Sequence, residues 1–587
     1  MAQPIIPVRT ADGRVAPVPP RTTSRWVDVA LFGILGGIAY GLMRTATRWS
    51  APLDSGTQID LGAIHLPLYA AYSTLRMSLA YVISLVFSLA YAKIAVASRQ
   101  AERVMIPLLD ILQSIPILSF MPAVVLGLAA LVPGRTVGLE LAAILLIFTS
   151  QAWNMAFSFH QSLLTIPREL SEASTVYRLS PWRRFTRLEL PFGAISLIAN
   201  SMMSWAGGWF VLTASEQFAL GDKKNLRLPG LGSYLQAAAD AGDLTATLLG
   251  LATLIGVIVL LDQFFWRPLV VWSDRFKFEQ SGGDEIPTSR VAALLQGSAI
   301  VDWMSSRLWI PLWRWMDRTL GQAGGATRRF AIPAPYRRGG RHVVRWTIVG
   351  AFVALALWGA VSAIQELAGL PGAVWAHVWL SAAATFARTA IALIIAAAWT
   401  IPVGVAIGFN PKWSYRAQPL VQVAASVPAN TVFPILLLVL LAIPGGLNIA
   451  SVLLMLLGTQ WYILFNVIAG AMSIPSDLRE AAVVYQVTGW RRWRTLILPA
   501  IFPYLVTGMI TATGGAWNAS IVSEYVSYKG HKVMTLGLGS LIADAADRAD
   551  FRLLLAGTLV MAAIVITGNR VVWRRLYALA EARFRLD

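Results

Sequence analysis

The chain has 587 residues, of which 56% are hydrophobic and only 13% are charged, and its mean hydropathy is +0.61. A soluble domain carries about 25% charged residues, so this composition excludes an ordinary soluble protein and indicates an integral membrane protein. The formal net charge of +18 does not indicate nucleic-acid binding, because the arginines gather between apolar runs, as they do beside an anionic membrane surface. Cysteine is absent, which excludes disulfides, thiol chemistry and cysteine-ligated metals.

Residues 1–25 are rich in proline and arginine and contain no apolar core of the signal-peptide type. We expect them to form a disordered cytoplasmic tail. A first repeat, residues 26–272, follows with six apolar runs close to the roughly 20 residues that cross the hydrocarbon of a bilayer. These predicted spans are Trp26–Met43, Leu66–Ala97, Val104–Val132, Leu139–Leu164, Pro191–Leu212 and Leu244–Trp272.

Residues 273–345 form a polar connector between this repeat and a second one. Its stretch Arg290–Leu320 mixes tryptophans with arginines, which indicates either an amphipathic helix on the membrane lipid or a contact with a cytoplasmic partner. The second repeat, residues 346–587, brings the total to about twelve spans in an all-α integral membrane protein. Its spans are predicted near Val343–Ile364, Val374–Phe409, Ala417–Ile443, Asn448–Ser473, Pro499–Val522 and Phe551–Val572.

The two halves share motifs at a nearly constant offset. The segment Glu172–Pro191, EASTVYRLSPWRRFTRLELP, returns 308 residues later as Glu480–Pro499, EAAVVYQVTGWRRWRTLILP. The segment Gln113–Pro122 likewise matches Ala425–Pro434, and a proline-broken helix exposes backbone groups that can line a passage. Each half has an even number of spans, so we expect two parallel six-helix repeats related by a pseudo-twofold axis along the membrane normal.

Lysines and arginines gather in the N-terminal tail, in both copies of the longer motif and at the C-terminal end. By the positive-inside rule this side is the cytoplasm, so both termini of this multi-pass protein are predicted to be cytoplasmic. Four lysines on the opposite side occupy corresponding places in the two repeats, where they would favour small anions at the mouth of a passage. They are Lys223, Lys224, Lys529 and Lys532.

The doubled motif resembles the one that marks the membrane-spanning permeases of bacterial ABC importers. The Trp-Arg-Arg segments, the later Glu216 and Glu524, and the LGS turns at Leu231 and Leu538 resemble the branch for nitrate, sulfonates, taurine and bicarbonate. The resemblance covers about residues 66–272 and 374–573. It implies a fused tandem of two permease domains, two ATP-binding ABC subunits that carry ATP and Mg, and a periplasmic or lipid-anchored substrate-binding protein.

The resemblance further implies that each motif forms a coupling helix that docks in a cleft of an ATPase subunit. Independently of it, small alanines permit close packing, while Glu172 and Glu480 can pair with basic groups of a partner. The family's motif has glycine where this sequence has Arg178 and Gln486, so the docking angle is expected to differ, and Ser174 replaces an alanine in the first copy only. The predicted coupling residues are Glu172, Ala173, Tyr177, Arg178, Trp182, Arg183, Glu480, Ala481, Ala482, Tyr485, Gln486, Trp490 and Arg491.

Polar residues inside apolar runs face either a cavity or a neighbouring helix, because they are costly in lipid. Arg76 and Arg388, 312 residues apart, either pair with carbonyls or carboxylates or attract an anion. The resemblance places Glu216 and Glu524 at an external gate, which they would close by pairing with basic or amide groups; capping a helix or binding solvent is the alternative. The remaining pathway candidates are Gln113, Ser114, Asn200, Trp205, Trp209, Ser426, Asn430, Trp517 and Asn518.

The sequence contains no Gly-Lys-Ser or Gly-Lys-Thr of a phosphate-binding loop, and its five histidines lack metal-ligand spacing. We therefore predict no enzyme activity, cofactor or metal in this chain. The predicted function is that of a permease subunit that moves a small anionic solute into the cytoplasm by alternating access. An ion-coupled secondary transporter with parallel repeats is the alternative, although the spans offer it little beyond Asp110 and Glu140. A membrane scaffold is a further alternative.

Overall fold

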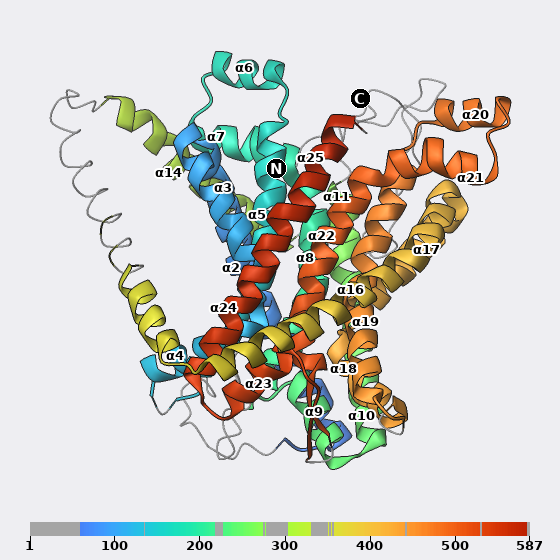
Figure 1. The fold of residues 1–587 in the computed structure, drawn as a ribbon. Helices are drawn as coiled ribbons and strands as arrows, with labels where there is room; N and C mark the ends of the chain where they lie inside the picture. Colours follow the sequence, from blue (N-terminus) through green and yellow to red (C-terminus); the bar gives the residue numbers. More distant parts are fainter. Residues whose placement is uncertain are drawn as a thin grey trace. The chain divides into compact units, whose positions relative to one another are not determined.

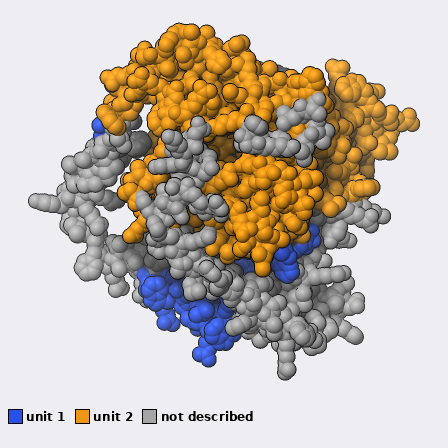
Figure 2. Space-filling view, turned by 90° about the horizontal axis from the view of Figure 1, so that it is seen from below, with its two compact units in different colours: residues 1–43, 158–200, 260–354 blue, residues 44–157, 201–259, 355–587 orange. Residues whose placement is uncertain are grey.

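The computed structural model describes residues 59–133, 135–217, 227–273, 276, 303–329, 350, 354, 357–440, 443–528 and 531–583. These residues are almost entirely helical, which confirms the all-α prediction (Figure 1). The chain divides into two compact units (Figure 2). Unit 1 comprises residues 1–43, 158–200 and 260–354, and unit 2 comprises residues 44–157, 201–259 and 355–587.

Eight of the described helices are long and apolar enough to cross a membrane, and two bent helix pairs raise the number to ten. Every predicted span inside the described ranges is thus matched by an apolar helix or a bent pair. The predicted span Trp26–Met43 and most of Val343–Ile364 lie outside the described residues, although residues 357–368 are helical. The eight helices are Ala63–Val96, Val137–Leu164, Pro181–Glu216, Leu244–Ser273, Gly372–Phe409, Gly446–Met472, Gly489–Ser523 and Phe551–Ala580.

Unit 2 holds most of the described helices of both repeats. From the first repeat it contains α2 (Leu66–Val96), α3 (Arg99–Ser114), α4 (Ile117–Leu131), most of α5 (Val137–Leu164), the second part of α8 (Leu190–Glu216), α9 (Leu231–Ala241) and most of α10 (Leu244–Leu261). From the second repeat it contains α16 (Gly372–Phe409), α17 (Pro411–Ser426), α18 (Ala429–Leu440), α19 (Gly446–Met472), α20 (Ser476–Val484), α21 (Gly489–Arg492), η6 (Trp493–Ile497), α22 (Leu498–Ser523), α23 (Leu538–Asp547), α24 (Phe551–Gly568), η7 (Asn569–Trp573) and α25 (Arg574–Arg583).

Unit 1 contains the first copy of the longer motif and the helix of the connector. The predicted helix within Arg290–Leu320 is present from Trp303 onward, while residues 290–302 lie outside the described ranges. Besides the end of α5 and the start of α8, the elements of this unit are α6 (Arg168–Val176), α7 (Pro181–Arg184), η2 (Phe185–Glu189), η3 (Asp262–Trp266), α11 (Arg267–Ser273), η5 (Ser305–Trp309) and α14 (Ile310–Arg329).

The predicted proline breaks are confirmed in both repeats. Helix α3 ends at Ser114 and α4 begins after Pro116, and in the second repeat α17 ends at Ser426 and α18 begins after Pro428. Proline has no N–H to continue a helix and disfavours helical backbone at the residue before it. The second pair is bent by 75°, so each repeat contains a broken helix in place of one straight span.

One β-hairpin interrupts the helical architecture of the described residues. Strands β1 (Tyr525–Tyr528) and β2 (His531–Met534) pair antiparallel, with Val526 opposite Val533. Both valines pack against a buried cluster that includes Leu437 of α18. The hairpin follows Glu524 directly, in the segment that the sequence analysis assigned to an external gate.

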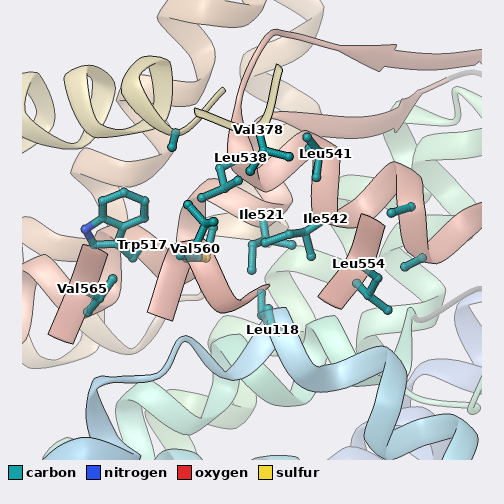
Figure 3. Packing of buried hydrophobic residues seen from close by; sticks show 14 of the residues in the cluster. Leu118, Val378, Trp517, Ile521, Leu538, Leu541, Ile542, Leu554, Val560 and Val565 are labelled. Carbon is teal, nitrogen blue, oxygen red and sulfur yellow. The ribbon is translucent and has the colours of Figure 1, made fainter. Parts of the chain in front are cut away.

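The core of unit 2 depends on small residues that let helices approach closely. A Cβ on Gly404 of α16 would lie 2.8 Å from Val467 of α19, which is the close approach expected between membrane helices. A second apolar cluster joins the two repeats, because Leu118 of α4 packs with Trp517 and Ile521 of α22 and with residues of α23 and α24 (Figure 3). The repeats therefore share a packed apolar interface in this unit.

Candidate functional site

The first copy of the longer motif forms a helix, a tight turn and a second helix in unit 1. The turn has Arg178 in the left-handed backbone conformation, with φ of 49°. The N–H of Leu179 donates to the carbonyl of Ser174 (3.1 Å), and the N–H of Arg178 donates to the carbonyl of Thr175 (3.0 Å). This pair of hydrogen bonds is the Schellman ending of a helix, in which glycine usually occupies the left-handed position.

The second copy makes the same turn in unit 2. Gln486 has φ of 50°, the N–H of Val487 donates to the carbonyl of Ala482 (2.8 Å), and the N–H of Gln486 donates to the carbonyl of Val483 (3.0 Å). The bend that a glycine would permit is therefore present in both copies without the glycine. Whether the docking angle differs from that of the family stays a prediction.

Each turn exposes large apolar side chains beside the predicted coupling carboxylates. Tyr177 and Tyr485 are both 78% exposed, and Val176 and Val484 are exposed to a similar extent. Large exposed apolar groups in one place are typical of a surface that binds a partner. Around them, Glu172, Arg178, Arg183, Glu480, Gln486, Trp490 and Arg491 are exposed, Ala173, Trp182 and Ala481 are half-buried, and Ala482 is buried.

The substitution of serine for alanine in the first copy is accommodated inside its own helix. Ser174 and Ala482 occupy corresponding positions, and both are buried. The hydroxyl of Ser174 donates to the carbonyl of Ser171 at 2.6 Å, so the extra polar group is satisfied and the helix surface stays small at this point.

The two motif copies are held by different contacts, which the sequence analysis missed. In the second copy the guanidinium groups of Arg479 and Arg492 lie 4.8 and 5.1 Å from the ring centroid of Phe409, at the end of α16. In the first copy Arg184, which corresponds to Arg492, bonds Ser171 (3.1 Å) and Glu189 (3.1 Å). The recurrence of arginine at offset 308 was visible in the sequence, but its partners were not.

A buried polar cluster, here the first polar cluster, joins four helices of the first repeat. Arg76 of α2 makes two hydrogen bonds to Glu140 of α5, at 2.6 and 2.8 Å, and one to Glu216 at the end of α8, at 2.7 Å. Ser73 of α2 also donates to Glu216 (2.7 Å), and the N–H of Gly232 at the start of α9 donates to the same carboxylate (2.8 Å). All three charged residues are at most 5% exposed.

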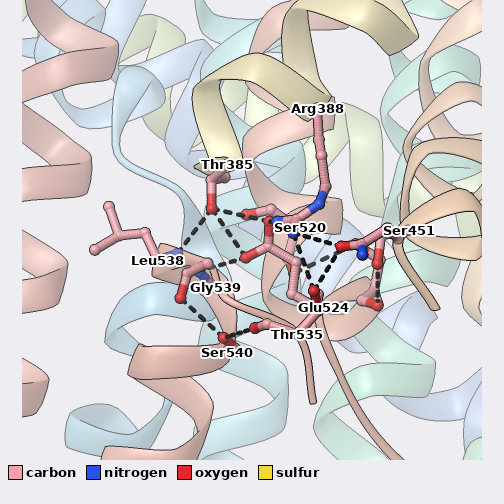
Figure 4. A network of polar contacts seen from close by, with 12 residues as sticks. Thr385, Arg388, Ser451, Ser520, Glu524, Thr535, Leu538, Gly539 and Ser540 are labelled. Carbon is pink, nitrogen blue, oxygen red and sulfur yellow. Dashed lines mark hydrogen bonds and ion pairs between the residues drawn. The ribbon is translucent and has the colours of Figure 1, made fainter. Parts of the chain in front are cut away.

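The second polar cluster repeats this arrangement (Figure 4). Arg388 of α16 donates to Glu524 at the end of α22 (2.7 Å), Thr385 donates to the same carboxylate (2.8 Å), and the N–H of Gly539 of α23 donates to it at 2.9 Å. In each cluster the carboxylate thus lies at the N-terminus of a short helix, where the helix dipole stabilises negative charge. The predicted charged residues therefore pair within each repeat: Arg76 with Glu216, and Arg388 with Glu524.

Glycine is required beside each carboxylate because of space. A Cβ on Gly230 would lie 2.3 Å from the carboxylate of Glu216, and one on Gly537 would lie 2.1 Å from that of Glu524. Both glycines have an extended backbone that any residue can adopt, so the constraint comes from the close approach of the carboxylate.

Besides Glu216 or Glu524, each arginine bonds a residue that differs between the repeats. Asn448 of α19 stands 308 residues after Glu140 and accepts a hydrogen bond from Arg388 at 2.7 Å. The first cluster thus contains two carboxylates and one guanidinium, and the second contains one of each. In the sequence Glu140 was interpreted only as an isolated carboxylate and Asn448 was missed, although the constant offset connects the two.

Most remaining pathway candidates contact neighbouring helices. Asn430 of α18 and Thr213 of α8 are hydrogen bonded at 2.9 Å, and Asn518 of α22 accepts from the N–H of Leu118 of α4 at 3.3 Å, so both pairs link the repeats. Other candidates contact their own or adjacent helices: Asn200 bonds Ser158 and Ser196, Ser426 bonds the carbonyl of Gln422, and Trp205 contacts Tyr81. Trp209 and Trp517 are buried, whereas Gln113 is exposed. The side chain of Ser114 lies outside the described residues.

A small cavity of about 30 Å³ lies between α8, α17 and α19, where the repeats meet. Ala425, the first residue of the segment Ala425–Pro434 that was predicted to line a passage, lines it, but none of the individually predicted pathway residues does. Gln422, Trp461 and Tyr462 also line it, together with Met203 and Gly207. Gln422 was missed although it is a polar residue inside a predicted span, whereas Trp461 and Tyr462 give no signal of a cavity within an apolar run.

The hairpin contains the one described member of the four mouth lysines. Lys532 pairs with Asp547 of α23 at 3.0 Å, and the hydroxyl of Tyr525 donates to the same carboxylate. Burial and the Asp547 carboxylate raise the pKa of Tyr525 above its ordinary value. Lys532 therefore holds the hairpin against α23 in addition to any attraction for anions, while Lys223, Lys224 and Lys529 lie outside the described residues.

Comparison with known proteins identifies the family. The family described as binding-protein-dependent transport system inner membrane component matches residues 84–265 and again residues 400–586, which confirms the predicted tandem.

Three relatives each align over a length close to one repeat. The taurine transport system permease protein TauC of Escherichia coli is 30% identical over 220 residues, which is 36% of this chain and 75% of TauC. The nitrate import permease protein NrtB of Synechococcus elongatus is 27% identical over 227 residues, 34% of this chain and 78% of NrtB. The putative aliphatic sulfonates transport permease protein SsuC of Bacillus subtilis is 25% identical over 226 residues, 38% of this chain and 75% of SsuC. Because the two matched segments cover more than half of the chain, this protein belongs to the family of binding-protein-dependent transport system inner membrane components and contains its domain twice.

Proposed function

We propose that the two repeats of this chain together form the membrane pathway of an ATP-driven importer for a small anionic solute. The relatives are named for taurine, nitrate, aliphatic sulfonates and bicarbonate. All of these solutes carry an ionised oxyanion group at neutral pH, and in taurine a protonated amine accompanies the sulfonate. The family description refers to transport that depends on a binding protein, so a periplasmic or lipid-anchored protein would deliver the solute. The chain would lie in a bacterial inner membrane with both termini in the cytoplasm, as the distribution of basic residues favours.

The recurrence of one exposed turn carries this proposal. Arg178 and Gln486 have the same left-handed conformation, and Tyr177 and Tyr485 have the same exposure, 308 residues apart and inside both family-matched segments. A short helix held at both ends by neighbouring helices moves as a rigid body and can transmit the motion of a partner. Two ABC subunits, as a homodimer or its equivalent, would dock here and hold ATP and Mg, so hydrolysis would occur on those subunits.

The polar clusters are proposed to hold the outer ends of the repeats closed. Each fastens the start of a short helix, α9 or α23, to two long helices through a buried carboxylate. Removing one member of a buried ion pair leaves an uncompensated charge and is strongly unfavourable, so a cluster either stays intact or reorganises as a whole. This behaviour suits an external gate that opens in one step when the binding protein docks.

The cavity between the repeats supports alternating access. Its volume of about 30 Å³ has room for only about two water molecules, so a hydrated anion requires the lining helices to separate. The amide of Gln422, the indole of Trp461 and the phenol of Tyr462 can all donate hydrogen bonds to an anion. The pathway would therefore select by neutral donors, which release an anion more readily than a fixed positive charge does.

The decisive experiment is purification of the tagged chain from its native membrane, followed by an ATPase assay. An ABC subunit is expected to co-purify, and Glu172→Ala combined with Glu480→Ala is expected to release it, because both carboxylates are exposed on the motif helices. As a matched control, Glu366→Ala removes an exposed carboxylate outside both motifs and should leave the complex intact. If no ATPase associates in mild detergent and an ion gradient drives uptake instead, the importer proposal is wrong.

A further inference from the structure

The helix of the connector contacts the first motif copy inside unit 1. The ring centroids of Trp313 on α14 and Trp182 on α7 are 6.2 Å apart. The carboxylate of Asp317 lies 3.7 Å from Nε of Arg183 and 3.6 Å from Nη2 of Arg187. The connector therefore does more than join the repeats, because its helix packs against the segment that follows the exposed turn.

The second motif copy differs from the first at one residue of this contact. Thr495 stands where the first copy has Arg187, and the nearby Arg494 stands one position earlier, on another side of the helix. Trp490, which corresponds to Trp182, is 73% exposed. The two motif copies thus differ in sequence at this contact.

Helix α14 presents three different faces. Trp313 and Asp317, four residues apart, form the face that contacts the motif. Leu312 and Trp315 lie on a second face and are 48% and 62% exposed. A third face carries Arg314 and Arg318, again four residues apart, and both are exposed. Among residues 303–319 there are three arginines and one acidic residue, and that acid, Asp317, is already paired with the motif.

We infer that α14 binds an anionic lipid surface, with Leu312 and Trp315 inserted at the bilayer interface and Arg314 and Arg318 among the headgroup phosphates, and thereby links the lipid to the first motif copy. An exposed apolar face beside a basic face is the pattern of helices that lie in the membrane interface. Arginine side chains extend along such a surface and reach the phosphates. The regulatory part of the inference rests on the proposed function, since it takes the motif as an ATPase docking segment.

The weakness of the α14 contact supports this assignment. The Arg183 and Arg187 side chains are 46% and 49% exposed, and their distances to Asp317 are long for an ion pair. Exposed pairs of this kind contribute little and are screened by salt. Attachment of the other two faces to lipid would hold α14 in place. The lipid composition would then determine how strongly α14 restrains the movement of the first motif copy.

The first test measures the depth of α14 without any partner protein. Since the chain contains no cysteine, Leu312→Cys provides one site for a nitroxide label in the full chain, reconstituted in nanodiscs of phosphatidylcholine with or without phosphatidylglycerol. We expect the label to be accessible to oxygen and protected from a water-soluble nickel chelate when phosphatidylglycerol is present. Adding Arg314→Gln and Arg318→Gln should return it to water. Equal nickel accessibility in both lipid mixtures, or protection that appears only after an ATPase subunit is added, would overturn the lipid assignment.

The second test measures the consequence for coupling. In nanodiscs with phosphatidylglycerol, Arg314→Gln with Arg318→Gln should change the ATPase rate of the assembled complex several-fold, towards the rate of the unaltered complex in phosphatidylcholine. Arg548→Gln removes an exposed arginine outside α14 and should have no effect. A lipid-independent rate in both forms would refute the link to the motif. Failure of any ATPase to assemble would instead contradict the proposed function and leave the depth measurement standing.

Discussion

Glu140 and Asn448 occupy corresponding positions in the two repeats, and each bonds the arginine of its own polar cluster. Glu140 makes two hydrogen bonds to Arg76, at 2.6 and 2.8 Å, whereas Asn448 accepts one from Arg388, at 2.7 Å. The side chains of Arg76 and Arg388 are 4% and 12% exposed. The first cluster is therefore the more buried and the more strongly bonded of the two, and the two clusters are not equivalent.

Exchanging these residues tests that difference. Glu140→Asn should destabilise the protein by about 2 kcal/mol, because it replaces two charge-assisted hydrogen bonds to a buried guanidinium, while Glu216 still balances the charge of Arg76. Asn448→Glu should change stability by less than about 1 kcal/mol, because its arginine is more accessible to solvent. The measurement is thermal unfolding of both variants in the same detergent. Equal effects of the two exchanges would show that the clusters are equivalent.

Removing the charge of Glu524 tests the gate. Glu524→Gln leaves Arg388 without its buried carboxylate while retaining an oxygen for Thr385 and the N–H of Gly539, so α23 should detach more readily. We expect ATP hydrolysis to become less dependent on the binding protein and transport to fall by about tenfold, which corresponds to about 1.4 kcal/mol in the closed-to-open equilibrium.

Glu366→Gln is the control for Glu524→Gln, because it removes a carboxylate from an exposed pair with Arg552. It should leave both activities within experimental error. Unchanged transport and unchanged coupling in Glu524→Gln would remove the gate proposal, even if the variant were less stable.

The internal duplication made much of the architecture predictable. The offset of 308 to 312 residues was enough to locate both motif copies, both proline breaks and the pairs Glu216–Glu524 and Arg76–Arg388. Spacing could do this because each copy repeats residue types that are rare in apolar helices. The spans followed from hydropathy alone, since about 20 apolar residues suffice to cross a bilayer.

The partners of these residues were not predictable in the same way. Glu140 lies 64 residues from Arg76 and on another helix, so their contact depends on the rotation of α2 and α5 about their axes. In the sequence Phe409 is likewise one apolar residue among many, and only the structure shows that Arg479 and Arg492 lie over its ring. Residue type was also a poor guide at Arg178 and Gln486, because the Schellman hydrogen bonds hold a backbone that glycine would adopt more easily.

Restoring glycine at those turns should stabilise the protein. Arg178→Gly and Gln486→Gly each relieve a left-handed backbone that costs a residue with a Cβ roughly 1 kcal/mol. Each change should therefore raise the midpoint of thermal unfolding slightly. Arg183→Gly, inside the helix that follows, should lower it, because glycine is unfavourable in a helix. A decrease for both turn variants would mean that the arginine and glutamine side chains contribute more than the backbone strain costs.

Filling the space beside the buried carboxylates should be unfavourable in both repeats. A methyl group on Gly230 or Gly537 would lie within 2.3 Å of the carboxylate of Glu216 or Glu524. The carboxylate must then move from its donors, so Gly230→Ala and Gly537→Ala should each cost about 2 kcal/mol or more in unfolding free energy. Gly514→Ala is the matched control, because no atom lies within 4 Å of its added Cβ and alanine is the better helix former.

Hydrogen exchange gives the local readout of the same change. The amides of Gly232 and Gly539 donate to these carboxylates, so each should exchange faster in the alanine variant of its own repeat and remain protected in the variant of the other repeat. If Gly537→Ala left the exchange of Gly539 unchanged, the Glu524 carboxylate would have to make room for the added methyl group while it remained bonded to the start of α23. The second polar cluster would then be looser than its hydrogen bonds indicate, and its role as a gate would lose its structural basis.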